Sequence, residues 1–317
     1  MIRMTLLIAT LTAGAGLFLL AACATGAGAG RTLAERFPPE GRFIAVEGTR
    51  LHYRETGPAD AEPVLVLHGA SSNLNEPRVA LEDALLEYRV IWLDRPGLGW
   101  SERPDGDWSP EREAALIAAF LDAVGIERAA VIGHSWGAAI TLRLMMDHPD
   151  RTKGAVLIAP AVRAWVGEAA WYNRVTLWPV AGTVMTRAIA PTIGASRLAD
   201  GAAEAFSPEP VPENYVERTR LPLILRASAW RANAADMANV NEHLAVQETR
   251  YAEIDQPVIL IAGPKDTVVS TRRHAVPVAE TLPRGELVLV EGAGHNLHHH
   301  HPGRVAEALA AVIARSE

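Results

Sequence analysis

The chain has 317 residues, which is enough for one large α/β domain with an insertion or for two small domains. It carries 30 basic and 37 acidic residues, a formal net charge of -7, without a basic stripe. This balance disfavours nucleic-acid binding and favours a small-molecule substrate. The single cysteine excludes an internal disulfide.

The N-terminal segment has the layout of an export signal. Arg3 leads into an apolar stretch from Met4 to Ala22 that contains no acidic residue. Residues 1–22 are therefore predicted to be a signal peptide, and Leu20-Ala21-Ala22-Cys23 resembles a bacterial lipobox, which implies lipidation of Cys23. A plain transmembrane anchor stays open, because the stretch is near the roughly 20 residues that span a bilayer. Either alternative places the rest of the chain outside the cytoplasm, tied to a membrane of the cell envelope. Residues 23–35 are expected to be a flexible tether.

Strand and helix patterns alternate along the first part of the body. Residues 42–46 and 50–55 alternate around a Glu-Gly-Thr turn, which is typical of an antiparallel hairpin at a sheet edge. The later strands are continuous apolar runs, as expected when helices cover both faces. Strands are predicted at residues 63–67, 88–93, 128–132 and 153–159, and helices at 74–87, 111–124 and 136–147. Repeated β-α units indicate a parallel sheet.

The alternation stops after Pro160 and resumes at Gln256. Residues 161–252 show no strand pattern and many aromatic residues among helical runs, so a helical cap is expected there. The α/β core is then divided between residues 36–160 and 253–317. The cap aromatics either line an acyl or aromatic pocket or only pack the helices together, and both interpretations stay open. Two strands at 257–262 and 286–290 and a helix at 302–315 complete the core.

A G-x-S-x-G motif follows the predicted strand at residues 128–132. It reads Gly133-His134-Ser135-Trp136-Gly137 and is followed directly by a predicted helix. Ser135 is expected at a tight strand-to-helix turn, where the two glycines leave room for a strained backbone. The helix N-terminus directs free N–H groups to the same place and favours negative charge developing beside the serine.

This stretch resembles the nucleophile elbow of the α/β-hydrolase fold superfamily. The resemblance implies an α/β fold with a mostly parallel central sheet, helices on both faces, and a helical cap inserted after the sixth strand. It also implies a triad in the chain order Ser, Asp, His. Ser135, Asp266 and His295 have this order, and each follows a predicted parallel strand, so all three are expected at one sheet edge.

The three residue types supply what acyl transfer needs. A serine hydroxyl requires an imidazole to take its proton and a carboxylate to fix the imidazole's tautomer. No carboxylate stands after the sixth predicted strand, and Asp94 lies in a loop that resembles a structural loop of the family, so Asp266 is the expected acid. By the same resemblance, the oxyanion would be held by the backbone N–H groups of Ala70 and Trp136, with Ser71 as an alternative to Ala70.

Four consecutive histidines, His298 to His301, raise the question of a metal site. Consecutive residues do not all face one ion, and no acidic or cysteine ligand accompanies them, so no metal is expected. The interpretation favoured here is an exposed start of the last helix, with one histidine packing behind His295. No cofactor is expected either.

The function predicted from these residues is hydrolysis of a carboxylic ester, a small-molecule substrate, through an acyl-enzyme. The same triad also serves carbon–carbon bond hydrolases, proline iminopeptidases, amidases and cofactor-free haloperoxidases, and a binding lipoprotein without catalysis is a further alternative. The chain also resembles epoxide hydrolases and haloalkane dehalogenases at His68-Gly69 and at residues 94–101. Both of these use an aspartate nucleophile, and Ser135 argues against both.

Overall fold

A computed structural model describes residue 28, residues 30–165, residue 167 and residues 170–316. The expected signal peptide at residues 1–22 and the expected lipidation site, Cys23, lie outside the described residues. Within the described ranges, no helix has both the length and the apolar character that a membrane span requires.

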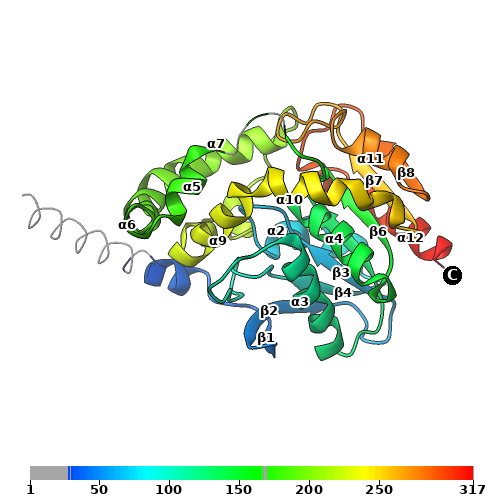
Figure 1. Cartoon of the computed structure of the whole chain (residues 1–317), viewed down its shortest axis with the longest axis horizontal. Coiled ribbons are helices and arrows are strands. Elements are labelled where there is room, and N and C mark those ends of the chain that lie inside the picture. Colours follow the sequence, from blue (N-terminus) through cyan, green and yellow to red (C-terminus); the bar gives the residue numbers. More distant parts are fainter. Residues whose placement is uncertain (1–27, 29, 166, 168–169, 317) are drawn as a thin grey trace, which may run out of the picture.

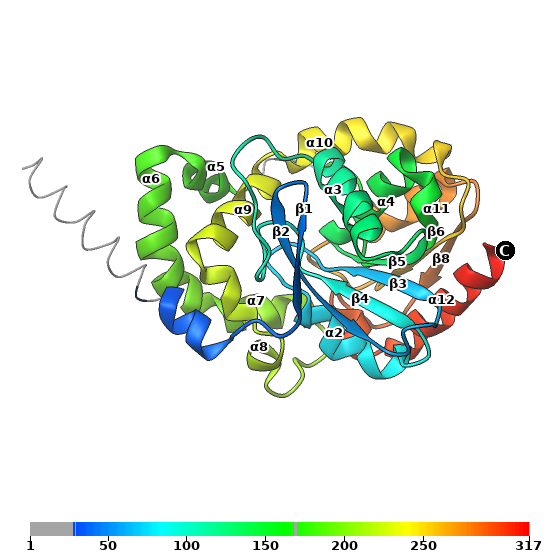
Figure 2. The same cartoon turned by 90° about the horizontal axis from the view of Figure 1, so that it is seen from below.

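An eight-stranded sheet forms the centre of the molecule, in the order β1-β2-β4-β3-β5-β6-β7-β8 (Figures 1 and 2). β1 and β2 form the expected antiparallel hairpin, β2 is antiparallel to β4, and the remaining pairs are parallel. The strands are β1 Arg42–Val46, β2 Thr49–Thr56, β3 Pro63–Leu67, β4 Arg89–Leu93, β5 Ala129–His134, β6 Thr152–Ile158, β7 Val258–Ala262 and β8 Gly285–Leu289. The predicted strands are therefore present, with ends shifted by a few residues at most.

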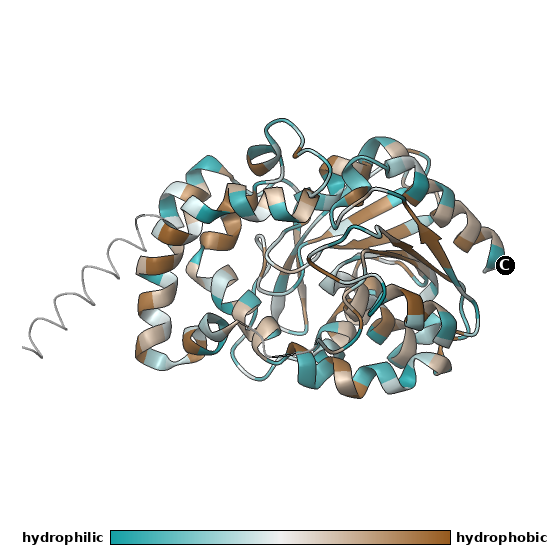
Figure 3. Cartoon of the chain, turned by 90° about the horizontal axis from the view of Figure 1, so that it is seen from above, coloured by the Kyte–Doolittle hydropathy of each residue, from teal (hydrophilic) through white to brown (hydrophobic). Residues whose placement is uncertain are grey.

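Helices cover both faces of this sheet because successive strand side chains point to opposite sides. Leu65 and Leu67 of β3 pack in one hydrophobic cluster with α3 (Pro110–Ala123), α4 (Trp136–Asp147) and α11 (Ala275–Thr281). Val64 and Val66 pack in a second cluster with α2 (Asn75–Leu81), η1 (Glu82–Leu85) and α12 (Pro302–Arg315). Figure 3 shows the resulting apolar strands between the two helical layers. Two covered faces explain the continuous apolar runs in the sequence.

The described chain between β6 and β7 contains helices joined by loops and no strand, as expected for a cap inserted after the sixth strand. Its elements are α5 Trp171–Leu177, α6 Pro179–Val184, the π-helical η3 Met185–Gly194, α7 Ala195–Phe206, α8 Tyr215–Arg218, η4 Leu221–Leu225, α9 Ala227–Ala238, α10 Val240–Gln247 and η5 Glu248–Glu253. Pro191 lies inside η3, where it removes one backbone donor from the α-helical pattern. Figure 1 shows these helices above the sheet and at the end of the molecule away from the C-terminus.

Residues 30–36 differ from the flexible tether expected over residues 23–35, because they are helical. Leu33 packs against a small cluster that joins Leu98 of the core to Ile224 and Ala229 of the cap. Burial of this leucine explains the ordered helix. The first part of the described chain therefore lies against the cap (Figure 2).

Candidate active site

Ser135 lies at the turn between β5 and α4, with a backbone conformation of φ 52° and ψ −118°. Such a conformation costs a non-glycine residue about 1–3 kcal/mol and is held only by its surroundings. The two flanking glycines allow it: a Cβ on Gly133 would lie 2.4 Å from the hydroxyl of Thr141, and a Cβ on Gly137 would lie 2.3 Å from the carbonyl oxygen of Leu67. The sequence motif is therefore a tight elbow that holds the serine at the carboxyl end of β5.

Asp266 and His295 lie on the loops after β7 and β8, and they are in contact. The Nδ1 of His295 is 2.8 Å from Oδ2 of Asp266, while Oδ1 of Asp266 accepts the backbone N–H groups of Val268 and Val269, each at 2.8 Å. Because the carboxylate accepts, Nδ1 of His295 donates, and Nε2 is left as the basic nitrogen. This is the tautomer that a general base requires.

Ser135 and His295 line one cavity of about 920 Å³ at the carboxyl edge of the parallel strands. Asp266 is behind the histidine, with a side chain 1% exposed. A smaller hollow of about 320 Å³ lies at the opposite edge, beside Pro63 and Lys153 at the amino ends of their strands. Ligands of open α/β sheets collect at the carboxyl edge, so the larger cavity is the candidate active site.

The loop after β3 approaches the serine closely. A Cβ on Gly69 would lie 3.1 Å from the Cβ of Ser135, and Ala70 lines the cavity. The Gly69 carbonyl accepts hydrogen bonds from Nδ1 of His68 at 2.9 Å and from Arg95 at 3.3 Å. In a trans peptide the N–H points away from the carbonyl, so these bonds fix the direction of the Ala70 N–H.

The second expected oxyanion donor is the N–H of Trp136, the first residue of α4, where the helix provides no acceptor of its own. Ser71, the alternative to Ala70, is engaged elsewhere: its N–H donates to Oδ1 of Asn233 in the cap at 2.6 Å. The arrangement therefore favours Ala70 and Trp136 as the pair of donors.

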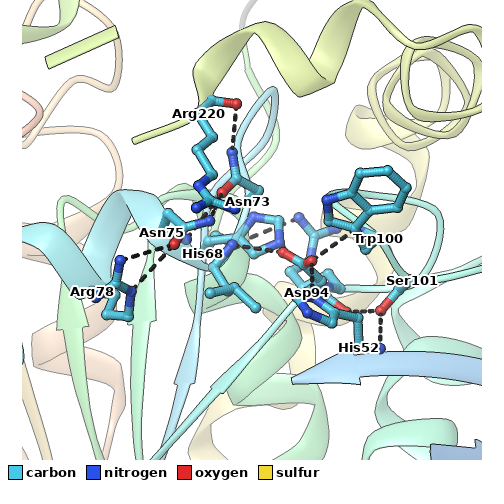
Figure 4. A network of polar contacts seen from close by, with 12 residues as sticks. His52, His68, Asn73, Asn75, Arg78, Asp94, Trp100, Ser101 and Arg220 are labelled. Carbon is cyan, nitrogen blue, oxygen red and sulfur yellow. Dashed lines mark hydrogen bonds and ion pairs between the residues drawn. The ribbon is translucent and has the colours of Figure 1, made fainter. Parts of the chain in front are cut away.

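Asp94 holds the loop after β4 and does not contact the candidate triad. Its carboxylate accepts the N–H groups of Leu74 and Trp100, each at 2.8 Å, and pairs with His52 at 2.7 Å. Figure 4 shows this network together with Ser101, whose hydroxyl donates to the Asp94 carbonyl. These contacts support a structural role for Asp94 and leave Asp266 as the acid.

The four histidines only partly follow the expected exposed position, because His300 is exposed whereas His298 is buried. They precede α12, and His298 is completely buried; its Nε2 and that of His299 lie 3.0 Å and 2.9 Å from Oε1 of Glu76. The ring that packs against His295 is His134, at 5.0 Å between centroids, and His298 packs behind His134 at 4.5 Å. The sequence pattern gave no sign of this arrangement, because Glu76 is 222 residues from His298.

Buried Glu76 is the polar centre of this histidine cluster. Burial opposes its ionisation, but His298 and the hydrogen bonds from His298 and His299 hold the pKa of the carboxyl well below its usual range. Burial and the facing His298 also hold the pKa of His134 well below its usual range. Glu76, His298 and His299 offer ligand atoms within 4.8 Å of one another, the only such group of potential metal ligands in the described residues. The mutual hydrogen bonds already account for their positions.

The cavity wall is mostly apolar and comes largely from the cap. Trp171, Tyr172 and Trp230 line it, whereas Trp165 packs against the core and Trp178 is exposed. The two interpretations of the cap aromatics therefore each apply to some of them. Other apolar wall residues are Met185, Ile189, Ile193, Leu198, Leu221, Ile224 and Val268.

Comparison with known proteins places the chain in a family. The alpha/beta hydrolase fold family matches residues 62–302. The chain is 28% identical to epoxide hydrolase A of Mycobacterium tuberculosis, over 86% of this chain and 96% of that one. It is 34% identical to the dihydrolipoyllysine-residue acetyltransferase component of the acetoin cleaving system of Cupriavidus necator, but over only 38% of this chain and 32% of that relative.

A solved structure, a bacterial membrane phospholipase A, matches with a TM-score of 0.70 at 20% identity, over 100% of this chain and 99% of that one. At this level of identity the match supports the fold alone. The family and the enzymes among its relatives support a hydrolase. The chain belongs to the α/β-hydrolase fold family.

Proposed function

We propose that the protein is a serine hydrolase that cleaves carboxylic esters through an acyl-enzyme. The observation that carries the proposal is the 2.8 Å contact between Asp266 and His295 at the cavity that also contains the strained Ser135. A serine in this conformation presents its hydroxyl outward, and the neighbouring histidine has the tautomer that accepts a proton at Nε2.

In the proposed mechanism, Oγ of Ser135 attacks the ester carbonyl while Nε2 of His295 takes its proton. The N–H groups of Ala70 and Trp136 stabilise the oxyanion. Removing one such donor typically lowers kcat by about 10²–10³-fold. The imidazolium, stabilised by Asp266, protonates the departing alcohol as the acyl-enzyme forms. Water then repeats the sequence and releases the acid and the free serine. No cofactor or metal takes part.

The substrate proposed is an ester with an apolar acyl group. The cavity volume of about 920 Å³ and its apolar wall are suited to a hydrocarbon chain or ring rather than to a sugar or a peptide. Burying each methylene of such a chain contributes about 0.8 kcal/mol. The wall also includes polar and charged groups, among them Glu76 and Asn296 of the core and Arg197 and Glu204 of the cap.

A fluorophosphonate probe tests the catalyst directly. The folded protein should be labelled, Ser135→Ala should not, and Ser72→Ala should be labelled as a control because Ser72 is another serine of the cavity wall. A panel of p-nitrophenyl esters should then show higher kcat/KM for medium and long acyl chains than for acetate. No labelling of folded protein would favour a binding protein, and activity only on N-terminal amino-acid amides would contradict the ester assignment.

We further propose that the protein is attached to the cell envelope through a lipid on Cys23, after removal of residues 1–22, with the catalytic domain outside the cytoplasm. The lipobox-like sequence at residues 20–23 supports this placement. Incorporation of labelled palmitate should be lost in Cys23→Ser. Retention of residues 1–22 in the mature protein would instead favour a transmembrane anchor.

A further inference from the structure

Large hydrophobic side chains are exposed along one stretch of the cap. Trp171, Tyr172, Trp178, Val180 and Ile193 are between 41% and 70% exposed, and they make up five of the eleven large hydrophobic residues that are exposed in the described chain. They lie in α5, α6 and η3 or, for Trp178, between α5 and α6, at the end of the molecule opposite the C-terminus (Figure 1). We call these five residues the cap rim. A cluster of this kind on a water-exposed surface indicates a binding partner.

The charge of the same stretch is one-sided. Residues 170–199 contain Arg174, Arg187 and Arg197 but no Asp or Glu, although the whole chain has a net charge of -7. Arg197 pairs with Asp200, the residue that follows this stretch, at 3.6 Å. All three arginines are exposed. Apolar and aromatic side chains combined with arginines, without carboxylates, are typical of helices that lie in the interface of an anionic bilayer. Tryptophan and tyrosine are also the residues that prefer the headgroup region.

The cap rim is continuous with the wall of the active-site cavity. Trp171, Tyr172 and Ile193 belong to both. A partner on the cap rim therefore covers this part of the cavity wall. A bilayer in that position would deliver an apolar acyl chain to Ser135 without passing it through water, where exposure of the chain is unfavourable.

The path of the chain supports the same orientation. Leu33, in the helical residues 30–36, packs in a cluster with Leu198 and Trp230 of the cap. Figures 1 and 2 show this first helix beside the cap helices that carry the rim. The apolar residues 4–22 precede it in sequence by only a few residues. The first described helix, which follows this apolar stretch in sequence, is therefore at the same end of the molecule as the cap rim.

We propose that the cap rim binds an anionic lipid bilayer, with the mouth of the catalytic cavity facing the membrane. The delivery of an ester from the bilayer rests on the proposed hydrolase function, whereas binding of the rim to lipid does not. The two proposals can therefore fail separately, and the binding test uses protein in which Ser135 is replaced by alanine.

The test is fluorescence quenching in the full chain, reconstituted in vesicles of phosphatidylcholine and phosphatidylglycerol that contain brominated acyl chains. We expect quenching of the Ser135→Ala protein, which falls when Trp178→Phe is added and is mostly lost when Trp171→Phe is added as well, because both tryptophans belong to the cap rim. Trp108→Phe is the matched control, because Trp108 is half-buried between Arg103 and Arg112 on the core. Removing phosphatidylglycerol, or replacing Arg187 by Gln, should weaken the quenching, with about fivefold weaker binding per arginine.

A second variant, Trp178→Ser with Val180→Ser, checks the consequence for catalysis. Neither residue lines the cavity. Hydrolysis of a soluble short-chain ester should be unchanged, while hydrolysis of an ester embedded in vesicles should fall at least fivefold. Equal quenching with and without Trp178 would overturn the proposal. Sedimentation of the protein as a dimer that dissociates on these two substitutions would also overturn it, because the cap rim would then be a contact between two copies.

Discussion

Replacing Arg95 is predicted to lower both the free energy of unfolding and kcat more than replacing any other residue outside the proposed triad. It is completely buried, and its guanidinium pairs with Glu113 of α3 at 2.7 Å and with Asp236 of α9 at 2.8 Å. Burial opposes its charge, but these two carboxylates raise the pKa of the Arg95 guanidinium above its usual value. It also donates to the carbonyl of Gly69, whose peptide bond carries the Ala70 N–H. One side chain thus joins the core, the cap and the proposed oxyanion site.

The substitution Arg95→Met keeps much of the volume and removes the charge. Asp236 retains Arg103 at 2.7 Å, but Glu113, whose side chain is 3% exposed, loses its closest cation. Breaking a buried pair by removing one partner costs about 3–5 kcal/mol, a large part of a total stability of about 5–15 kcal/mol. The Gly69 carbonyl also loses a charged donor, so we expect kcat to fall by about 10- to 100-fold, less than for complete loss of an oxyanion donor.

Urea unfolding and ester kinetics measure the two effects. The control is Arg304→Ala, because Arg304 pairs with Glu307 on the surface, where such a pair contributes less than about 1 kcal/mol. Adding Glu113→Leu to Arg95→Met should recover much of the stability, since it removes the unpaired charge, but should not recover kcat. If Arg95→Met costs no more stability than Arg304→Ala, or if the double variant regains kcat, the reasoning is wrong.

Three further predictions concern single residues of the site. Asp266→Asn should lower kcat on a soluble ester by up to about 10⁴-fold with little change in the unfolding midpoint, because the histidine loses its tautomer rather than its packing. Gly137→Ala should lower the free energy of unfolding, measured in urea, by about 3 kcal/mol, because the new Cβ would lie 2.3 Å from the Leu67 carbonyl oxygen. Gly303→Ala in α12 is the control: its Cβ would meet nothing within 4 Å, and the substitution should raise the free energy of unfolding by about 0.5–1 kcal/mol. Burial and the charge of a neighbouring arginine lower the pKa of His68 from 6.5 to about 4, so the unfolded chain takes up the proton first and stability falls as the pH drops from 6.5 to 4. At pH 5 protonation of His68 in the unfolded chain lowers the free energy of unfolding by about 2 kcal/mol. Between pH 7.5 and 5.0, His68→Asn should therefore lose about 2 kcal/mol less unfolding free energy than the unsubstituted protein.

The arrangement of the sheet could be predicted because each strand leaves a local pattern. A strand covered on both faces must be apolar at every position, as in Val64 to Leu67. Such a run can be recognised from the local sequence, without knowing which strands lie beside it. The triad positions follow from the same pattern, since Ser135, Asp266 and His295 each come shortly after such a run. The contact between Asp266 and His295 is what the structure adds.

The buried charges could not be predicted in the same way, because each depends on a partner far along the chain. Arg95 and Asp236 are 141 residues apart. Four adjacent histidines look like a solvated surface until Glu76 is placed beside them. One signal was present in the sequence: Glu113 is four residues before Ile117 and seven before Phe120, both fully buried on α3, so it shares the apolar face of that helix. A carboxylate on a buried face requires a cation, and Arg95 supplies it.

The cap is attached to both halves of the proposed catalytic machinery, which limits how the cavity can open. The carbonyl of Ala205 in α7 accepts the N–H groups of His295 at 3.1 Å and Asn296 at 2.9 Å, while Asp236 in α9 holds Arg95 and, through it, the peptide before Ala70. Movement of α7 or α9 away from the core would therefore displace the base and the oxyanion donor together. Substrate entry through α5, α6 and η3, the part of the cap that carries the exposed rim, would leave these contacts in place and preserve the aligned site.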